Sequence, residues 1–556
     1  MESAAFSATA RSGNVGRLYD ETAATHPNRL AIETNSATGE RTGEADGATG
    51  GRSGTTYTHA DLRDRSARFA GGLRDLGLTP GDRVGVFLPN RPAFVVAALG
   101  AIKAGTPFVP LNPQFRPREV AYRLDDADAA AVVVHESLLG TLETALDGLD
   151  ADPTVVVHAD GAPRSETGDD ARGVLDGSAG DDRTAADVRF VDVDGEPFVA
   201  GRDGDDVAMQ PYTSGTTGEP KGVLLTHRNL RAQSFVGFER TTLDAEEERF
   251  LSVLPLSHIA GFVNRTWQPL VRGASVYLRD PQEWDPGAAM ATIEAESITK
   301  FGAVAAMYVD IINHESFGEY DLSSLAEAME GGTDMPVAVQ ERFEAEAEVD
   351  LFEAYGLTET GGGTHAGINA TFGPRPGTVG QPFRATDCKV VDEDGEEVSP
   401  GESGELLVRG PHVMAGYHDR PDETADAFTD DGYLRTGDVV RRDEDNYYEV
   451  LGRKSDVILT AGYNVYPNEV EEVLHEHPSV EDASVAGVPD DRRGETVKAF
   501  VVPADGTDPD AERLRQHCLE HMAAYKHPRE VEFVQRLPRT TSGKVQRFKL
   551  ASGGDD

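Results

Sequence analysis

Short apolar runs rich in β-branched residues alternate with helical patterns along this chain, and this alternation constrains its fold more than any other feature. Strand-like runs occupy Arg83 to Leu88 and Ala130 to Val134, and helical patterns occupy Ala60 to Leu76 and Glu119 to Asp125. Buried strands that alternate with helices are typical of parallel sheets covered by helices. The sequence therefore predicts an α/β fold with mostly parallel or mixed sheets.

The length of 556 residues exceeds what one hydrophobic core organises, so at least two domains are expected. We predict a large N-terminal domain, 1–452, and a small C-terminal α+β domain, 453–556. A strand at Val457 to Thr460 would open the second domain. The low-complexity stretches at about 35–56 and 159–206 are predicted to be surface insertions or disordered loops.

The charge balance excludes several kinds of partner. The chain has 97 acidic and 52 basic residues and a net charge of −45, spread along its length. This excess argues against nucleic acid and anionic membranes as partners and indicates a halophilic protein, adapted to a salt-rich cytosol. The N-terminus lacks an apolar core of signal-peptide length, and no apolar run is long enough to span a bilayer, so we expect a cytoplasmic protein. Because Cys388 and Cys518 are far apart in the sequence, we also expect no disulfide.

Residues 212–222 read Y-T-S-G-T-T-G-E-P-K-G, a composition suited to holding a polyphosphate. Glycines let backbone N–H groups approach phosphate oxygens, hydroxyls donate hydrogen bonds, and a lysine supplies positive charge. The loop is not a Walker P-loop, because Pro220 and Gly222 stand where that motif needs Gly and Ser or Thr. The candidate phosphate-binding residues are Thr213, Ser214, Gly215, Thr216, Thr217, Gly218 and Lys221.

With this loop and four later segments in matching order, the chain resembles the acyl-adenylate-forming superfamily, which includes acyl-CoA synthetases, luciferases and the adenylation domains of peptide synthetases. The matching segments extend from Tyr212 to Lys549. The second of them reads F-E-A-Y-G-L-T-E-T over 352–360. The resemblance implies that Tyr355 and Gly356 border adenine, that Thr358 contacts the α-phosphate, and that Glu359 binds Mg²⁺.

Further nucleotide contacts follow from the same resemblance. Asp438, in Y-L-R-T-G-D, would accept hydrogen bonds from both ribose hydroxyls, and Arg453, in G-R-K-S-D, would also contact the ribose. Gly331 and Gly332 would border adenine through backbone groups. Lys221 would contact the β- and γ-phosphates of ATP.

The last segment, P-R-T-T-S-G-K-V-Q-R, carries Lys544, which matches the catalytic lysine of the superfamily. Attack of a carboxylate on a phosphate brings two anions together, and the repulsion of unit charges at 4 Å is about 4 kcal/mol at an effective dielectric of 20. A positioned ammonium would relieve this repulsion in the transition state. Lys544, Thr358, Glu359 and His258 are therefore the candidate catalytic residues, with His258 at the approach of acyl group and thiol.

Members of the superfamily activate a carboxylate with MgATP and then transfer it to a thiol, and a rotation of the C-terminal domain separates the two steps. By resemblance Gly462 and Tyr463 would line the coenzyme A tunnel, and Ser455 stands at the hinge, where Asp or Lys is usual. Phe262 and Trp267 are candidates for the acyl channel. Residues 301–308 lack a usual proline and three glycines occupy 361–363, both of which bear on the acyl pocket.

The resemblance is strongest to fatty acyl-CoA synthetases, which implies a ligase that acts on a medium- or long-chain fatty acid, ATP and coenzyme A, with Mg²⁺. One alternative is an adenylating enzyme that loads a carrier-protein thiol or an amine. Another is a non-catalytic sensor of acyl groups or nucleotides. A homodimer is one option for its assembly, and the sequence leaves it open.

Overall fold

The computed structural model describes most of the chain, which divides into two compact units. Unit 1 comprises Met1–Gly302, Leu357–Gly363 and Pro411–Thr424, and unit 2 comprises Ala303–Gly356, Thr364–Gly410 and Ala425–Asp556. The described residues are 13–34, 55–149, 152–160, 188–213, 219–235, 243–244, 246–333, 335–460, 462–490, 492–540 and 544–551.

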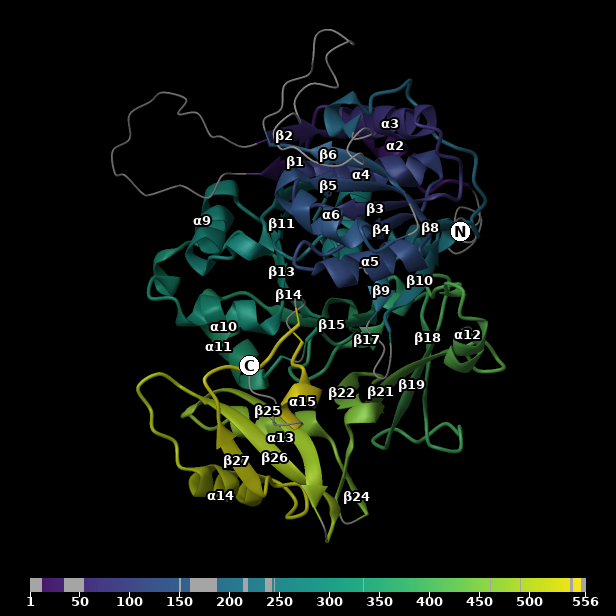
Figure 1. The fold of residues 1–556 in the computed structure, drawn as a ribbon. Helices are drawn as coiled ribbons and strands as arrows, with labels where there is room; N and C mark the ends of the chain where they lie inside the picture. The colour runs from purple at the N-terminus through teal and green to yellow at the C-terminus, as the bar shows by residue number, and fades with distance from the viewer. Residues whose placement is uncertain are drawn as a thin grey trace. The chain divides into compact units, whose positions relative to one another are not determined.

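The first sheet of unit 1 is mainly parallel, as the sequence predicts (Figure 1). Its strands lie in the order β20-β10-β8-β4-β3-β5-β6-β7, and β9 pairs with β10. The strands β8, β4, β3, β5, β6 and β7 are parallel, and β10 pairs antiparallel with its neighbours. Their bounds are β3 Arg83–Phe87, β4 Phe108–Pro110, β5 Ala129–His135, β6 Thr154–His158, β7 Val188–Arg189, β8 Val207–Met209, β9 Tyr212–Thr213, β10 Lys221–Thr226 and β20 Gly416–Tyr417.

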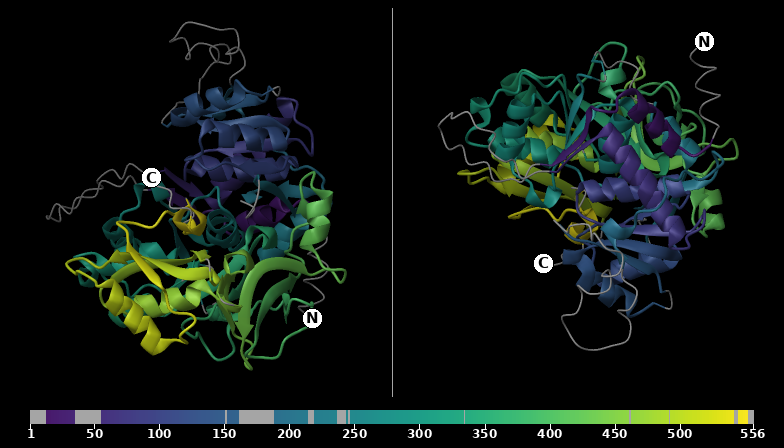
Figure 2. Two further views of the ribbon diagram at one scale, coloured as in Figure 1. Left: turned by 60° about the horizontal axis from the view of Figure 1, so that its bottom comes forward. Right: turned by 90° about the horizontal axis from the view of Figure 1, so that it is seen from above.

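Helices cover this sheet in a layered arrangement (Figure 2). Helix α4 (Pro92–Ala104) is buried along its whole length, which explains why it is apolar on every face. It packs against β3 and against α3 (His59–Asp75), which begins with a capping box between Thr58 and Asp61. The other helices that pack here are α5 Pro117–Asp126, α6 Leu139–Leu146 and α7 His227–Gln233.

Unit 1 also contains the strands β13-β11-β12-β1-β2 of a second sheet. Strands β1, β12, β11 and β13 are parallel, and β2 is antiparallel to β1. Residues 260–267 form a π-helix, η3, that leads directly into α8. The bounds are β1 Leu30–Thr34, β2 Thr55–Thr58, β11 Arg249–Ser252, β12 Ser275–Leu278, β13 Lys300–Ala303, α2 Gly16–Thr25, η3 Ala260–Trp267, α8 Gln268–Arg272 and α9 Pro286–Glu296.

The C-terminal part of the predicted insertion at 159–206 lies against the first sheet and against helix α3. Strand β7 (Val188–Arg189) pairs with β6, and the backbone N–H groups of Gly195 and Phe198 donate to carbonyls of α3. A Cβ at Gly71 would collide with the backbone of Glu196, so this segment lies directly on the helix. The acidic composition of the stretch did not predict these contacts. A two-residue strand and hydrogen bonds between backbone groups depend little on which side chains are present. The stretch 35–54 lies outside the described residues.

Unit 2 begins with helix α10, which is followed by two parallel strands, β14 and β15, joined by helix α11. Strand β16 pairs with β17, and a four-stranded antiparallel sheet follows in the order β18-β19-β21-β22. The bounds are α10 Ala305–Asn313, β14 Glu327–Gly331, α11 Val337–Ala347, β15 Leu351–Leu357, β16 Gly362–Ala366, β17 Gln381–Pro382, β18 Asp387–Val391, β19 Ser403–Arg409, α12 Pro421–Ala427, β21 Leu434–Arg442 and β22 Tyr448–Arg453.

The C-terminal residues form a small α+β structure, which confirms the α+β fold that the sequence predicts for the C-terminal domain. Its sheet has the order β24-β23-β26-β25, with β27 parallel to β26. Helix α13 begins with a proline in its first turn and packs against β25 and α14 over a core that includes Val470, Leu474 and Val485. The boundary at 452/453 stays a prediction. The bounds are β23 Ile458–Thr460, β24 Tyr463–Val465, α13 Pro467–His475, β25 Val480–Asp490, β26 Gly494–Pro503, α14 Ala511–His521, β27 Glu530–Phe533 and α15 Arg547–Ala551.

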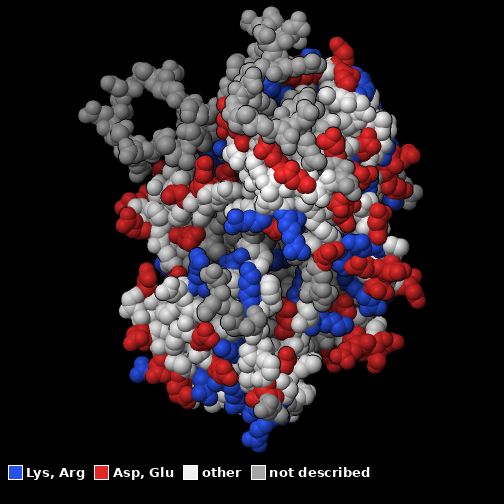
Figure 3. Space-filling model, in the orientation of Figure 1, with Lys and Arg blue, Asp and Glu red and all other residues white. Residues whose placement is uncertain are grey.

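Acidic side chains are scattered over the face drawn in Figure 3 rather than gathered in one patch. Their mutual repulsion opposes compaction, and salt screens it, since the Debye length falls from about 10 Å at 0.1 M to about 3 Å at 1 M. We expect the thermal midpoint of unfolding to rise by several degrees between low and molar KCl, measured by circular dichroism. An unchanged midpoint would contradict adaptation to salt.

A search of the helices among the described residues finds none with both the length and the apolar character that a membrane span requires.

Candidate functional site

Lys221 is the first residue of β10 and follows the predicted phosphate loop. Its Nζ is 2.7 Å from a carboxylate oxygen of Glu423 and 4.6 Å from the ring centroid of Tyr417. The register of the sheet explains this neighbourhood, because Val223 of β10 pairs with Tyr417 of β20. At the start of the loop, Thr213 pairs with Lys221 across the strands β9 and β10.

Tyr417 also contacts the predicted magnesium ligand. Its hydroxyl donates a hydrogen bond of 3.1 Å to the Glu359 carboxylate, and the Met414 N–H donates to the Glu359 carbonyl. Thr358 and Glu359 are half-buried on a 3-10 turn, η6 (Thr358–Thr360). One tyrosine therefore contacts the Lys221 ammonium with its ring and the Glu359 carboxylate with its hydroxyl.

The glycines after this turn have a structural reason. Gly361 and Gly362 have φ values of +64° and +139°, which side chains other than glycine rarely adopt. A Cβ at Gly362 would collide with the amide oxygen of Asn264, which lies on the π-helix η3. On the same helix, the Arg265 guanidinium occupies the space that a side chain at Gly302 would need. The unusual glycines thus make room for two polar side chains.

The π-helix follows His258 and contains both aromatic candidates for the acyl channel. The Ala260 N–H lies 3.3 Å from His258 Nδ1 and donates to it, so the neutral ring carries its proton on Nε2. Phe262 is 1% exposed and packs edge-on against Phe108, and Trp267 is fully buried with its indole N–H donating to Ser234. Both aromatic side chains lie in the core of unit 1, and their contribution to an acyl channel stays a prediction.

In unit 2, the predicted ribose ligand Asp438 sits in a ring of polar contacts. Its Oδ1 is 2.9 Å from Arg453 Nε, and its Oδ2 accepts a 2.5 Å hydrogen bond from the Tyr355 hydroxyl. Asp438 and Arg453 are directly opposite each other on the antiparallel strands β21 and β22. Arg453 also donates to the carbonyl of Thr436, which holds its guanidinium in place.

The Asp438 carboxyl is only 4% exposed, and its ionisation reflects two opposing effects. Burial raises the pKa of Asp438 above its ordinary value, whereas Arg453, the hydrogen bond from Tyr355 and the Lys544 ammonium each lower it. Burial, followed by the charge of Asp438, also raises the pKa of Tyr355, so its hydroxyl stays protonated and donates. The Asp438 carboxylate therefore accepts the hydrogen bond from Tyr355, although its burial disfavours the ionised form.

Lys544 lies in the same unit, close enough for its charge to act on Asp438. Its side chain is exposed, and its backbone is tied to Thr540, whose N–H donates to the Lys544 carbonyl at 2.7 Å. An isolated bridge pairs Arg539 with Val545, the residue after Lys544. Backbone contacts thus hold Lys544 in place, and its side chain is exposed.

Gly331 and Gly332 lie at the end of β14, next to the end of β15. Gly331 pairs with Ala354, one residue before Tyr355, and Gly332 has a φ of +105°. The carboxyl ends of the two parallel strands meet at the same edge, which brings these glycines beside Tyr355. The Tyr355 ring packs edge-on against His365 at a centroid distance of 5.7 Å. Gly356 follows on β15.

The predicted coenzyme A and hinge residues occupy exposed turns of unit 2. Gly462 has a φ of +83°, and the Tyr463 ring is 56% exposed and stacks on Tyr525 at 4.6 Å. Ser455 lies on the 3-10 turn η8 (Lys454–Asp456), where its hydroxyl donates to the Asp456 carboxylate. These turns offer backbone and aromatic surface, and their roles stay predictions.

Five predicted phosphate-binding residues lie outside the described residues: Ser214, Gly215, Thr216, Thr217 and Gly218. Sequence reasoning also missed several residues. Tyr417 lies between the recognisable segments, and nothing in its neighbourhood in the chain marks it as a partner of Lys221 and Glu359. Asn264 and Arg265 could have been noticed as polar residues within the apolar stretch that contains Phe262 and Trp267.

Comparison with family models gives two matches. A model described as "AMP-binding enzyme" matches residues 19–418, and one described as "AMP-binding enzyme C-terminal domain" matches residues 469–544.

Curated relatives and solved structures agree with these matches. A feruloyl-CoA synthase of Amycolatopsis sp is 38% identical over 497 residues, which cover 89% of this chain and 94% of the relative. A long-chain-fatty-acid–CoA ligase of Bacillus subtilis is 34% identical over 533 residues, covering 89% and 90%. The crystal structure of an anthranilate CoA ligase with anthranoyl-AMP matches with a TM-score of 0.84 at 27% identity, covering 98% of this chain and 97% of the other.

Proposed function

Because the chain belongs to the AMP-binding enzyme family, we propose that it activates a carboxylic acid with MgATP and transfers the acyl group to coenzyme A. The observation that carries the proposal is the buried Asp438 carboxylate, held by Tyr355 and Arg453 within electrostatic reach of Lys544. The predicted class of enzyme, an AMP-forming acid–thiol ligase, agrees with the relatives reported above.

Asp438 suits the ribose of ATP because a carboxylate offers acceptors only, and two vicinal hydroxyls are donors. Arg453 favours the ionised form of Asp438 by lowering its pKa, and the ion pair orients the carboxylate. Tyr355 and the backbone at Gly331 and Gly332 are the proposed neighbours of the adenine, since they lie together at one edge of the parallel strands. The proposed site thus uses the carboxyl ends of strands, where ligands of α/β proteins usually bind.

Lys221 is the proposed partner of the β- and γ-phosphates. Its present partner, Glu423, is 43% exposed, so the ion pair is partly solvated and can be exchanged for a phosphate at little cost. Glu359 would hold Mg²⁺, whose preferred ligands are oxygens, and the hydrogen bond from Tyr417 orients the carboxylate. Bound Mg²⁺ would neutralise part of the phosphate charge.

In the first half-reaction, an oxygen of the acid bonds to the α-phosphorus and pyrophosphate leaves. Lys544 is proposed to lie between the two anions as they approach. In the second half-reaction, the coenzyme A thiol loses its proton to solvent, its sulfur bonds to the carbonyl carbon, and AMP leaves with the electrons of the broken C–O bond. His258 is proposed to line the approach of the acyl group and thiol.

For the acid, we propose a medium- or long-chain fatty acid, supported by the long-chain ligase among the relatives. An aromatic acid with polar substituents is the second candidate. Asn264 and Arg265 favour it, because they place an amide and a guanidinium on the helix proposed to border the acyl group. The feruloyl-CoA synthase at 38% identity also supports it.

The experiment that tests the proposal measures pyrophosphate release from MgATP across a panel of fatty, hydroxycinnamic and benzoic acids. Coenzyme A is then added, and the acyl-CoA product is quantified for each acid. Release that needs no coenzyme A, followed by thioester formation on its addition, is the expected result. Release without any thioester would favour a carrier-protein loader, and the absence of release with every acid would favour a sensor.

A proline at the proposed hinge tests the domain rotation. Proline fixes φ near −65° and restricts the residue before it, so Ser455→Pro is expected to hinder rotation about this turn. We expect the variant to form acyl-AMP at the normal rate and to lose most of its thioester formation, measured in separate half-reaction assays. Ser455→Ala, the control, should retain both rates. Equal loss of both half-reactions in the proline variant would argue against a hinge here.

A further inference from the structure

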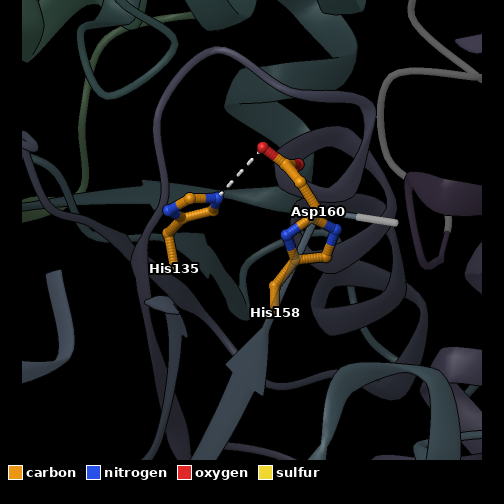
Figure 4. Close-up of side chains that lie close together, drawn as sticks. All are labelled: His135, His158 and Asp160. Atoms are coloured by element: carbon orange, nitrogen blue, oxygen red, sulfur yellow. Dashed lines mark ion pairs between the residues drawn. The ribbon is translucent and has the colours of Figure 1, made fainter. Parts of the chain in front are cut away.

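We propose that His135, His158 and Asp160 bind a divalent transition-metal ion of the zinc type, at one end of the first sheet of unit 1 (Figure 4). The site shares no residue with the proposed ligase chemistry. It is the only group of three or more His, Cys, Asp or Glu residues with converging ligand atoms that the described residues contain.

The sheet itself brings the two histidines together. His135 is the last residue of β5 and His158 the last of β6, and these parallel strands pair with His135 directly opposite His158. Register partners on parallel strands point to the same face, and the ring centroids are 5.7 Å apart. Asp160 follows His158 by two residues, which returns its side chain toward the rings, as Figure 4 shows.

The potential ligand atoms are close to the spacing that a metal needs. One nitrogen of each ring and one oxygen of Asp160 all lie within 4.8 Å of one another, and His135 Nε2 is 3.5 Å from Asp160 Oδ2. Bonds of about 2.0–2.1 Å in a tetrahedral site place ligand atoms roughly 3.4 Å apart. Binding would therefore require the side chains to rotate so that the most distant pair of ligand atoms approaches this spacing.

The surroundings leave the coordinating atoms available. The His135 side chain is only 9% exposed, and its Nε2 is buried without a hydrogen-bond partner, as is Nδ1 of His158. His135 Nδ1 accepts from the Ser137 backbone N–H at 3.3 Å and lies 2.7 Å from the Ser137 hydroxyl. A metal at Nε2 would require the ring proton on Nδ1, which would then donate to the Ser137 hydroxyl in place of the bond from the backbone N–H, the support that metal-bound histidines commonly have.

The local charges favour a cation. Glu136 adds negative charge next to the site, because its carboxylate accepts from the Asp160 N–H at 3.3 Å. Arg91 opposes binding, since its Nε lies 3.8 Å from the Asp160 carboxylate, and a bound metal would displace it.

The donor set decides the kind of metal. Two imidazoles and one carboxylate suit Zn²⁺ and related transition metals, whereas Mg²⁺ and Ca²⁺ prefer oxygen ligands only. Three protein ligands leave a fourth position for water. Since the ligands join the ends of two adjacent strands, a bound ion would stabilise this edge of unit 1 by mass action.

The test uses the full-length protein, freed of metal by chelation and kept in Mg²⁺. Co²⁺ is titrated while its visible absorption is recorded, and Zn²⁺ is then added as competitor. We expect one Co²⁺ per chain with a tetrahedral spectrum, displaced by Zn²⁺, and a thermal midpoint that rises with Zn²⁺ but not with added Mg²⁺. The proposal would be overturned if Co²⁺ gave no change in the visible spectrum and Zn²⁺ gave no change in the thermal midpoint.

Two variants separate this site from adventitious binding. Asp160→Asn, at an exposed position, and His158→Gln are each expected to weaken Zn²⁺ binding by at least about 10-fold. His521→Gln, which removes an exposed imidazole in unit 2, is the control and should bind Zn²⁺ normally. Equal affinity in the wild type and both site variants would contradict the proposal. Pyrophosphate release by the metal-free variants is expected to remain, so failure of one proposal leaves the other intact.

Discussion

Replacing Lys544 with alanine is expected to slow acyl-adenylate formation by about 100- to 1,000-fold, the usual cost of removing one positioned group that stabilises transition-state charge. The ammonium is exposed in the structure and acts on the nearby Asp438 carboxylate, so an anionic substrate at that site would attract it. ATP binding should change little, because Asp438, Arg453 and Tyr355 hold each other without it. Single-turnover pyrophosphate release and equilibrium ATP binding measure the two effects separately.

The matched control is Lys549→Ala, which removes an exposed lysine from α15 in the same C-terminal segment. This control measures the effect of removing one positive charge from a chain whose net charge is −45. Equal losses of ATP binding and of adenylation in the Lys544 variant would show that the lysine acts in binding rather than in the transition state.

Replacing Asp438 with asparagine is expected to weaken ATP binding by about 10- to 100-fold. The variant keeps the shape of the side chain but loses a charged acceptor, and hydrogen bonds to charged groups contribute about 1.5–3 kcal/mol each. It also leaves the Arg453 guanidinium without the carboxylate that lies 2.9 Å away. Calorimetric titration with ATP measures the change, and Asp431→Asn, at an exposed aspartate of the same unit, is the control.

This aspartate also predicts a pH dependence. Burial raises the pKa of Asp438, and only the ionised form accepts from both ribose hydroxyls. As pH falls through that raised pKa, the carboxyl takes up a proton and ATP binding should weaken. The amide that replaces the carboxyl in Asp438→Asn does not titrate, so the ATP affinity of this variant should stay constant over the same range. A wild-type affinity that did not change below neutral pH would argue against Asp438 as the ribose ligand.

Much of the proposed site could be predicted from the sequence because its chemistry is local. Tyr355, Thr358 and Glu359 lie within five residues, and the loop before Lys221 concentrates glycines and hydroxyls, so residue type and spacing alone suggest a nucleotide. Tyr417 could not be predicted, since only the pairing of β10 with β20 brings it to Lys221. The aromatic residues of η3 were noticed, but not the polar ones that the glycines at 302 and 362 accommodate.

The sequence by itself determined the alternation of strands and helices, the family and the identity of the groups proposed to meet the nucleotide, because periodicity and residue chemistry are properties of short segments. Only the tertiary structure decided which distant residues become neighbours. The antiparallel ladder places Arg453 opposite Asp438, and the parallel ladder places His158 opposite His135. Strand register arises from the packing of whole sheets, so no short segment contains it.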